Sequence, residues 1–148
     1  MNKIKLLLLV ILGFMGTNAL AQTSLSEAVA PGNKVFFQLV NDDEHPIPDD
    51  EIEDVTRELV AAGDWAIVAT VEEADFILKV ESKKKMVFNS PRTWLTPSVL
   101  DKDGNELWKS KTQQADATMF NGYRATNTCI SKVIEKSFKG DLFKKANR

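Results

Sequence analysis

Apolar residues recur at helical spacing in the first half of the chain. The stripe consists of Ile52, Val55, Leu59 and Val60. This period predicts an amphipathic helix over residues 51–62. We expect the helix to begin at a capping box formed by Asp50 and Glu53 and to end at Gly63 in the left-handed conformation.

Short apolar or alternating runs predict the strands of a sheet. The predicted strands span residues 34–40, 65–70, 76–88, 93–100 and 106–112. The apolar run at 65–70 is typical of a buried inner strand. The run at 34–40 is typical of a central strand covered on both faces, or of one with a wet face that is only partly polar. Because proline cannot donate to a strand ladder, Pro97 predicts a sheet edge or a bulge in its strand. Residues 101–105 predict a hairpin turn.

A second apolar stripe lies near the end of the chain. It consists of Thr126, Cys129, Ile130, Val133, Ile134 and Phe138. The stripe predicts a helix over residues 123–138, with Gly140 ending it. The element order is then β-α-β-β-β-β-α, with a right-handed crossover joining two parallel strands.

This order predicts an α+β fold built as a two-layer sandwich. It places a mixed sheet of about five strands beneath two helices on one face. A mostly β sandwich is the alternative if the last stretch is not helical. The predicted core contains Phe36, Ile52, Leu59, Ile67, Leu78, Leu107, Ile130 and Val133.

The first residues have the pattern of a secretory signal. Lys3 and Lys5 precede a short apolar run, and Ala19-Leu20-Ala21 fits a cleavage site. We predict a signal peptide over 1–21 cleaved after Ala21, a flexible lead-in over 22–33 and one α/β domain over 34–148. An uncleaved anchor or a buried first helix is the alternative. After cleavage no transmembrane segment is expected, and the protein is periplasmic or secreted.

Composition narrows the possible partners. The chain has 19 basic and 21 acidic residues, and signal cleavage removes two lysines and no acid. An acidic chain without a basic stripe argues against nucleic acid as the partner. The chain contains one cysteine, so it forms no internal disulfide.

The residues with potential chemistry each have a simpler interpretation. Cys129 lies on an apolar stripe, where a free cysteine packs as a small hydrophobe. His45, the one histidine, is expected in a solvated loop and cannot form a His-rich metal site. The acidic stretch Asp42–Glu51 offers oxygen ligands for a calcium ion, or is a solvated charge run with a helix cap.

The turn at Asp101 resembles the start of a calcium loop. Asp103 and Asn105 fit that pattern, but Glu106 occupies the glycine position and Thr112 the position of the bidentate glutamate. A tight hairpin explains the same residues. The sequence therefore predicts no catalytic, cofactor-binding or metal-binding residue and no cofactor.

One cationic stretch has aromatic neighbours and is the candidate partner surface. The surface consists of Lys83, Lys84, Lys85, Arg92 and Trp94. It suits an acidic protein, a polysaccharide or an anionic lipid surface. The alternative is a strand edge that lysines keep soluble.

Two short motifs resemble known envelope domains. Residues 73–80, EADFILKV, follow a helix that ends in glycine, and Asp101, Gly104 and Trp108 form a strand-DxxGxxxW-strand hairpin. The pattern resembles the N-terminal domain of TolB-type periplasmic proteins and the penicillin-binding-protein activator lipoproteins. The resemblance implies a small α/β domain that acts in binding or assembly. Unlike many of those relatives, this chain has no cysteine for a lipid anchor at the cleavage site.

The resulting hypothesis is a secreted or periplasmic non-enzymatic binding or assembly module of the cell envelope. Its partner would be a protein or another envelope component, held at an open sheet edge or at the candidate partner surface. Two alternatives remain open. One is a small envelope-glycan hydrolase with paired carboxylates, and the other is a secreted inhibitor or immunity-type protein.

Overall fold

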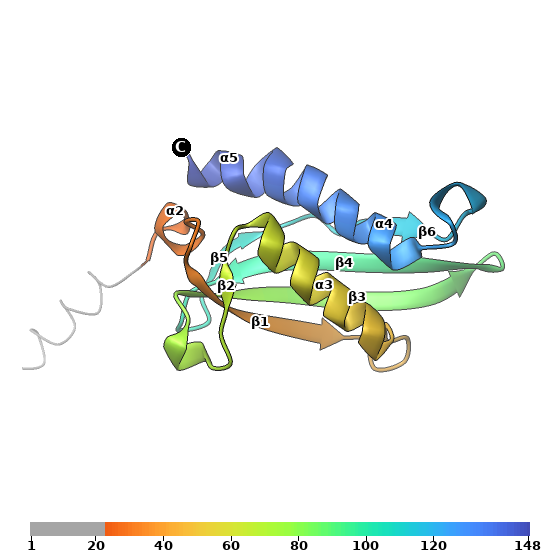
Figure 1. Ribbon diagram of the computed structural model, residues 1–148, viewed down its shortest axis with the longest axis horizontal. Coiled ribbons are helices and arrows are strands. Elements are labelled where there is room, and N and C mark those ends of the chain that lie inside the picture. The colour runs from red at the N-terminus through yellow and green to blue at the C-terminus, as the bar shows by residue number, and fades with distance from the viewer. Residues whose placement is uncertain (1–22) are drawn as a thin grey trace, which may run out of the picture.

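The computed structural model describes residues 23–148, so the predicted signal peptide and its cleavage after Ala21 lie outside the described residues. The described part of the chain forms a six-stranded mixed sheet (Figure 1). Its strands are β1 (Lys34–Asn41), β2 (Ala66–Ile67), β3 (Phe76–Val87), β4 (Ser90–Leu100), β5 (Glu106–Lys109) and β6 (Gln113–Asp116). The order is β2-β1-β3-β4-β5, and β6 also pairs with β4. β1 is parallel to β2 and β3, and the later pairs are antiparallel.

The helices cover one face of this sheet and leave the other open (Figure 1). The covering layer consists of α3 (Asp49–Ala62), α4 (Ala125–Lys132), the π-helical η3 (Val133–Leu142) and α5 (Phe143–Ala146). Three short helices complete the described chain: α2 (Leu25–Ala28), η1 (Val71–Glu73) and η2 (Met119–Asn121). The α+β class and the two-layer sandwich are confirmed.

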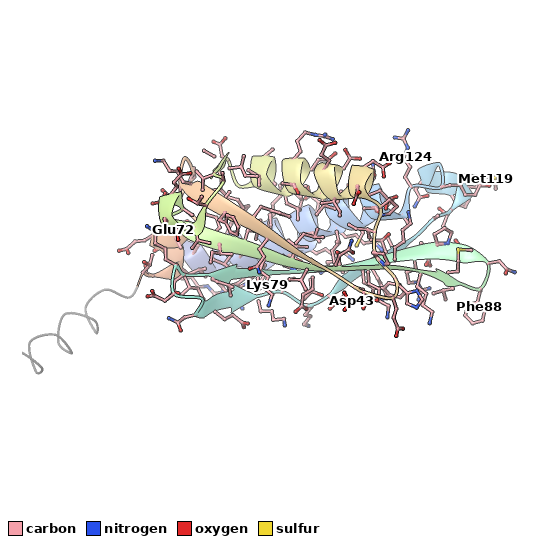
Figure 2. All side chains as sticks on the ribbon, turned by 90° about the horizontal axis from the view of Figure 1, so that it is seen from below. Asp43, Glu72, Lys79, Phe88, Met119 and Arg124 are labelled. Carbon is pink, nitrogen blue, oxygen red and sulfur yellow. The ribbon has the colours of Figure 1, made fainter. Side chains whose placement is uncertain are left out.

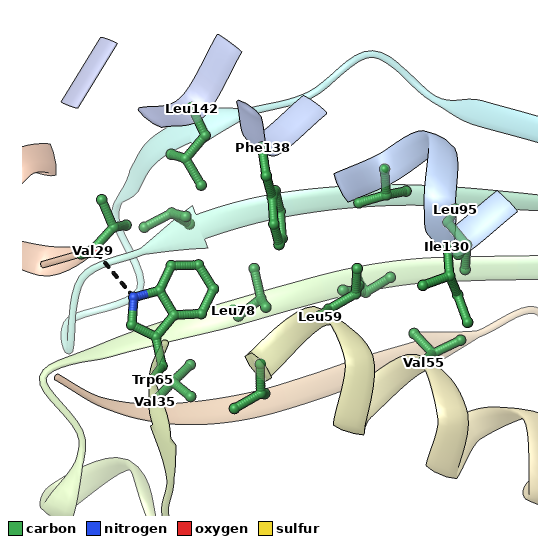
Figure 3. Packing of buried hydrophobic residues seen from close by; sticks show 14 of the residues in the cluster. Val29, Val35, Val55, Leu59, Trp65, Leu78, Leu95, Ile130, Phe138 and Leu142 are labelled. Carbon is green, nitrogen blue, oxygen red and sulfur yellow. Dashed lines mark hydrogen bonds between the residues drawn. The ribbon is translucent and has the colours of Figure 1, made fainter. Parts of the chain in front are cut away.

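The core lies between the helical layer and the sheet (Figure 3). Four predicted core residues have no solvent exposure: Leu59, Leu78, Ile130 and Val133. Ile52 and Leu107 are partly buried against the cluster. The predictions for Phe36 and Ile67 are wrong. Phe36 follows the buried Val35 in β1 and so lies on the open face, whereas Ile67 is 56% exposed on the edge strand.

The predicted strand 65–70 is also wrong, because the sheet takes only Ala66 and Ile67 from it, as an edge strand. Trp65 instead turns into the core. Its indole lies 5.0 Å from the Phe76 ring and 5.8 Å from the Phe138 ring, measured between centroids. The apolar run 65–70 therefore contributes Trp65 to the core and a two-residue edge strand to the sheet.

Both predicted ends of α3 need correction. Pro48 precedes the helix and no side chain caps it, so Asp50 and Glu53 form no capping box. Gly63 has φ −91°, and Asp64 takes the positive φ of 59°. Gly63 is required for space, because a Cβ there would overlap the Trp65 ring.

The predicted strand 106–112 is correct only as far as Lys109, where β5 ends, and β6 (Gln113–Asp116) was not predicted. Pro97, expected at an edge or a bulge, lies in the interior strand β4. Its carbonyl accepts a hydrogen bond at 2.9 Å from the N–H of Ser110, which lies between β5 and β6. Pro97, which has no N–H to donate, therefore faces the stretch between β5 and β6, where no ladder hydrogen bond is lost. This position is how the interior strand accommodates proline.

The C-terminal helical segment is displaced and longer than predicted. Tyr123 has φ 61° and lies before α4, and the helix passes Gly140 to end at Ala146. The wider π turns bring Phe138 and Leu142 into the core, where both are fully buried.

Within the predicted flexible lead-in 22–33, residues 23–33 contain α2 and pack on the domain. Ser24 caps α2 by accepting a hydrogen bond from the Glu27 N–H. Ala28 and Val29 are buried, and the Val29 carbonyl accepts the indole N–H of Trp65 at 2.9 Å (Figure 3).

Candidate binding surface

Strand alternation divides the candidate partner surface between the two faces of the sheet. Lys83 is paired with Trp94, and Lys85 with Arg92, across β3 and β4. These four side chains lie on the open face, because the neighbouring pair of Ser82 and Leu95 is buried toward the helices. Lys84 lies on the helix-covered face. The sequence grouped five residues, and the fold brings together four of them.

Lys84 forms part of the folded structure on the helix side. Its Nζ lies 2.5 Å from Glu51 Oε1 at the start of α3. The other Glu51 oxygen accepts a hydrogen bond from Thr126 Oγ1 of α4 at 2.9 Å. The Lys84 and Glu51 side chains are about one fifth exposed, at 23% and 21%. This lysine therefore joins β3 to the helical layer and is not available to a partner.

Trp94 is the centre of the open-face cluster. Lys83 Nζ lies 5.6 Å from the Trp94 ring centroid, and Arg92 Cζ lies 5.8 Å from it. The indole N–H donates to Gln114 Oε1 of β6 at 2.9 Å. Two cations and a cross-strand hydrogen bond thus hold the ring in place, and cation–π contact supports this arrangement.

Arg92 is oriented by a second contact with β6. Its Nε and Nη2 atoms donate to the two carboxylate oxygens of Asp116, at 2.5 Å and 3.1 Å. The hydrogen bond from Arg92 lowers the pKa of Asp116 below its ordinary value and raises the pKa of Arg92 itself. A bidentate pair of this kind fixes the guanidinium plane beside the tryptophan.

A groove of about 600 Å³ begins beside Trp94. Lys83 and Trp94 line it together with Thr96, Glu81, Asp42 and Asp43. The two aspartates come from the β1–α3 loop, whose sequence predicts either calcium ligands or a solvated charge run and not a part of the partner surface. A groove with one aromatic ring, one cation, three hydroxyl groups and three carboxylates offers both stacking and hydrogen-bonding contacts. Spacing along the sequence gave no signal that this loop lies beside β3 and β4.

Internal hydrogen bonds hold the acidic loop. Asp42 Oδ2 accepts the His45 N–H at 2.8 Å. The Asn41 side chain receives the Ile47 N–H and donates to the Ile47 carbonyl, at 2.9 Å and 3.0 Å. His45 is half-buried in this loop. Within residues 23–148 no group of three or more His, Cys, Asp or Glu side chains is placed to hold a metal ion.

The Asp101 carboxylate stabilises a tight turn. Its Oδ1 accepts the N–H groups of Asp103 and Asn105, at 3.0 Å and 2.8 Å, and its Oδ2 accepts from the Asn105 side chain. Burial of Asp101 opposes ionisation, but the hydrogen bonds from Asn105 and the turn backbone outweigh it and lower the pKa. The hairpin interpretation accounts for these residues.

Cys129 is fully buried on α4, as the apolar stripe predicts. Its Sγ lies 3.3 Å from the Gln113 carbonyl. Burial raises the pKa of the Cys129 thiol to about 12. A thiol that stays protonated at neutral pH is a poor nucleophile.

Comparison with known proteins places the fold. No protein-family model matches the chain, and no curated protein matches it. The PelC dodecamer structure from Paraburkholderia phytofirmans matches 72% of this chain and 89% of its own, with 21% identity and a TM-score of 0.53. A minor lipoprotein from Acinetobacter baumannii matches 72% and 91%, with 14% identity and a TM-score of 0.48. Lipoprotein GNA1162 from Neisseria meningitidis matches 74% and 99%, with 9% identity and a TM-score of 0.42.

At 21% identity, the likeness to the PelC structure shows a shared fold and nothing further. The specific resemblance to TolB-type domains and penicillin-binding-protein activators stays a prediction. Among the described residues, no helix has the length and apolar character that crossing a membrane requires.

Proposed function

We propose that this protein is a secreted or periplasmic, non-enzymatic binding module of the cell envelope, which holds its partner on the open face of the sheet beside Trp94. The carrying observation is the Trp94 ring, which two cations flank on a sheet face that the helices leave uncovered. Tryptophan and arginine are the residue types most enriched at the energetic centres of interfaces. The location rests on the predicted signal peptide.

The surface around Trp94 is held rigidly, which favours binding. Lys83, Trp94 and Arg92 lie on two long paired strands, so little conformational freedom is lost when a partner docks. The groove extends the contact to Asp42, Asp43 and Glu81. A partner that presents carboxylates or other acceptors to the cations, and donors to the groove, would match this pattern of charges.

Affinity capture from a cell-envelope extract tests the proposal. The bait is the folded chain, and the test variant carries Lys83→Glu and Trp94→Ala, which change the open face. Lys79→Glu is the matched control, because Lys79 lies on the same face of β3 outside the groove. We expect the control to recover the same partners as the unchanged chain and the test variant to lose them.

Recovery of the same partners by all three baits, or of none by any, would refute the Trp94 surface. Hydrolysis of an envelope polysaccharide that disappears in Glu81→Gln would refute the non-enzymatic part of the proposal. That outcome would favour the glycan hydrolase instead, because its chemistry needs ionisable carboxylates in the groove.

A further inference from the structure

Exposed aromatic and methionine side chains gather at one end of the molecule. Phe88 and Phe120 are each 98% exposed, Met119 is 74% exposed and Tyr123 is 71% exposed. Figure 2 shows Phe88 and Met119 at the same end, on two separate loops. We call Phe88, Met119, Phe120 and Tyr123 the aromatic tip.

Hydrogen bonds hold the two loops of the tip together. The Ala117 N–H donates to the Pro91 carbonyl at 2.8 Å, and Ser90 Oγ donates to the Ala117 carbonyl at 2.6 Å. β6 runs antiparallel to β4, so the chain after Ala117 continues toward the β3–β4 turn. The two loops of the aromatic tip are therefore held in a fixed relation, because both are hydrogen-bonded at the start of β4.

Two residues of the tip have an unfavourable backbone conformation. Phe88 has φ 51° and Tyr123 has φ 61°. Phe88 and Asn89 form the two-residue turn between β3 and β4, in which both central residues have positive φ. Asparagine and glycine suit these positions, whereas bulky residues are rare there. A large apolar ring at a strained, fully exposed turn contributes nothing to the core, which points to a role in contact.

The charge around the tip is positive. The segments 83–92 and 116–124 together contain five cations, of which Lys84 pairs with Glu51 and Arg92 with Asp116. The net positive charge therefore comes from Lys83, Lys85 and Arg124. Lys85, three residues before Phe88 in the sequence, and Arg124, which follows Tyr123, are both exposed. The acidic β1–α3 loop lies beside Ser82 and Lys84. Phe88 lies four residue steps beyond Lys84, roughly 13 Å along the strand. This distance exceeds the screening length of about 8 Å at physiological salt.

We propose that the aromatic tip inserts into the interface of an anionic lipid bilayer and attaches the protein peripherally. A bilayer interface accepts aromatic rings and attracts cations beside them, and it demands no matching pocket. The β3–β4 turn projects at this end of the molecule (Figure 1), so a protein partner would need a groove to receive the exposed rings of Phe88 and Phe120. This inference concerns a surface beyond the Trp94 groove and does not rest on the proposed function.

Vesicle co-sedimentation tests the proposal with the complete secreted chain. The vesicles contain phosphatidylethanolamine and phosphatidylglycerol, and phosphatidylcholine vesicles are the neutral comparison. The test variant is Phe88→Ser with Phe120→Ser. The matched control is Val40→Ser with Ile67→Ser, which removes two exposed apolar side chains elsewhere. All variants are prepared in the secreted form that begins after the predicted cleavage site, so residues 1–21 contribute to the binding of none of them.

We expect binding to anionic vesicles to fall by about tenfold or more in the test variant and to stay unchanged in the control. Lys85→Gln with Arg124→Gln is expected to remove the preference for anionic vesicles. Phe88→Trp should give a blue-shifted emission when anionic vesicles are added. Equal vesicle binding by the unchanged chain and the test variant, or no binding by either, would overturn the proposal. Self-association that the test variant abolishes would assign the tip to a second copy of the chain and would overturn it as well.

Discussion

The indole N–H of Trp65 donates to the carbonyl oxygen of Val29 across 36 residues of sequence, at 2.9 Å. Both residues are buried, at 6% and 4% exposure. The same indole packs edge-on against Phe76, Phe138 and Phe143. One side chain therefore joins the N-terminal segment, the sheet and the C-terminal helical layer.

The Trp65→Phe variant is expected to lose about 1–3 kcal/mol of unfolding free energy, because the Val29 carbonyl stays buried without a donor. Denaturant unfolding measures the loss, and amide exchange should become faster in α2. Trp94→Phe is the control, since its indole bond lies at the surface. We expect that control to change stability by no more than about 0.5 kcal/mol. Equal midpoints for Trp65→Phe and the unchanged chain would show that the bond has no net value.

Leu59→Ala and Ile130→Ala are each expected to reduce the unfolding free energy by about 2–5 kcal/mol, because both side chains are fully buried in the core. Ile67→Ala removes a similar side chain at an exposed edge and is expected to cost no more than about 0.5 kcal/mol. Thermal or denaturant unfolding of the three variants gives the comparison. A large loss for Ile67→Ala would contradict the edge position of β2.

The sequence was sufficient for the elements whose periodicity and burial agree. The stripe with Val55 and Leu59 predicts α3, and alternation around Leu78 predicts β3. It was insufficient where one distant contact decides the local structure. Trp65 belongs to an apolar run that is typical of a strand. Its indole packs against Phe76 and Phe138 in the core, and β2 therefore has only two residues.

The candidate partner surface was predicted only in part, again because contacts between residues distant in the sequence decide which side chains lie together. Alternation alone separates Lys84 from Lys83 and Lys85, because successive strand residues point to opposite faces. The sequence does not reveal that Glu51, 33 residues earlier, receives the Lys84 ammonium. It also gives no sign that Asp42 reaches the groove beside Trp94, since that depends on how the β1–α3 loop closes over β3.

The ion pair between Lys84 and Glu51 predicts unequal effects for adjacent lysines. Lys84→Met is expected to cost about 1–3 kcal/mol, because it leaves the mostly buried Glu51 carboxylate with Thr126 as its remaining side-chain donor. Lys85→Met, at an exposed position of the same strand, should stay within about 0.5 kcal/mol. Denaturant unfolding distinguishes them.

A double-variant cycle isolates the pair itself. The combined Glu51→Gln and Lys84→Met changes should be less destabilising than the sum of the single changes, with a coupling of about 1 kcal/mol. Strict additivity would mean that the two side chains do not interact measurably in solution.

Cys129 is expected to resist thiol reagents in the folded protein, because its thiol is buried and remains protonated at neutral pH. Labelling with a maleimide or Ellman's reagent should be slow without denaturant and fast once the chain unfolds. Rapid labelling under native conditions would contradict the buried position. The Cys129→Ala variant is the control for reaction at other groups.

The same residue predicts how stability changes with alkaline pH. Burial raises the thiol pKa from 9.0 to about 12 in the folded chain. Between these values the unfolded chain has released the proton and the folded chain still holds it. The unfolded state then binds fewer protons, so stability falls as pH rises. The contribution is complete below the unfolded pKa and is lost as pH rises through the folded one.

Comparison with Cys129→Ala separates this effect from the titration of lysine and tyrosine, which both chains share. The difference in unfolding free energy between the two chains should be constant below pH 9. Above pH 9 the unchanged chain should become progressively less stable relative to Cys129→Ala. The expected slope is about 1 kcal/mol for each pH unit. A difference that stays constant across the alkaline range would mean that the Cys129 thiol titrates alike in the folded and unfolded states, and that water reaches it beneath α4.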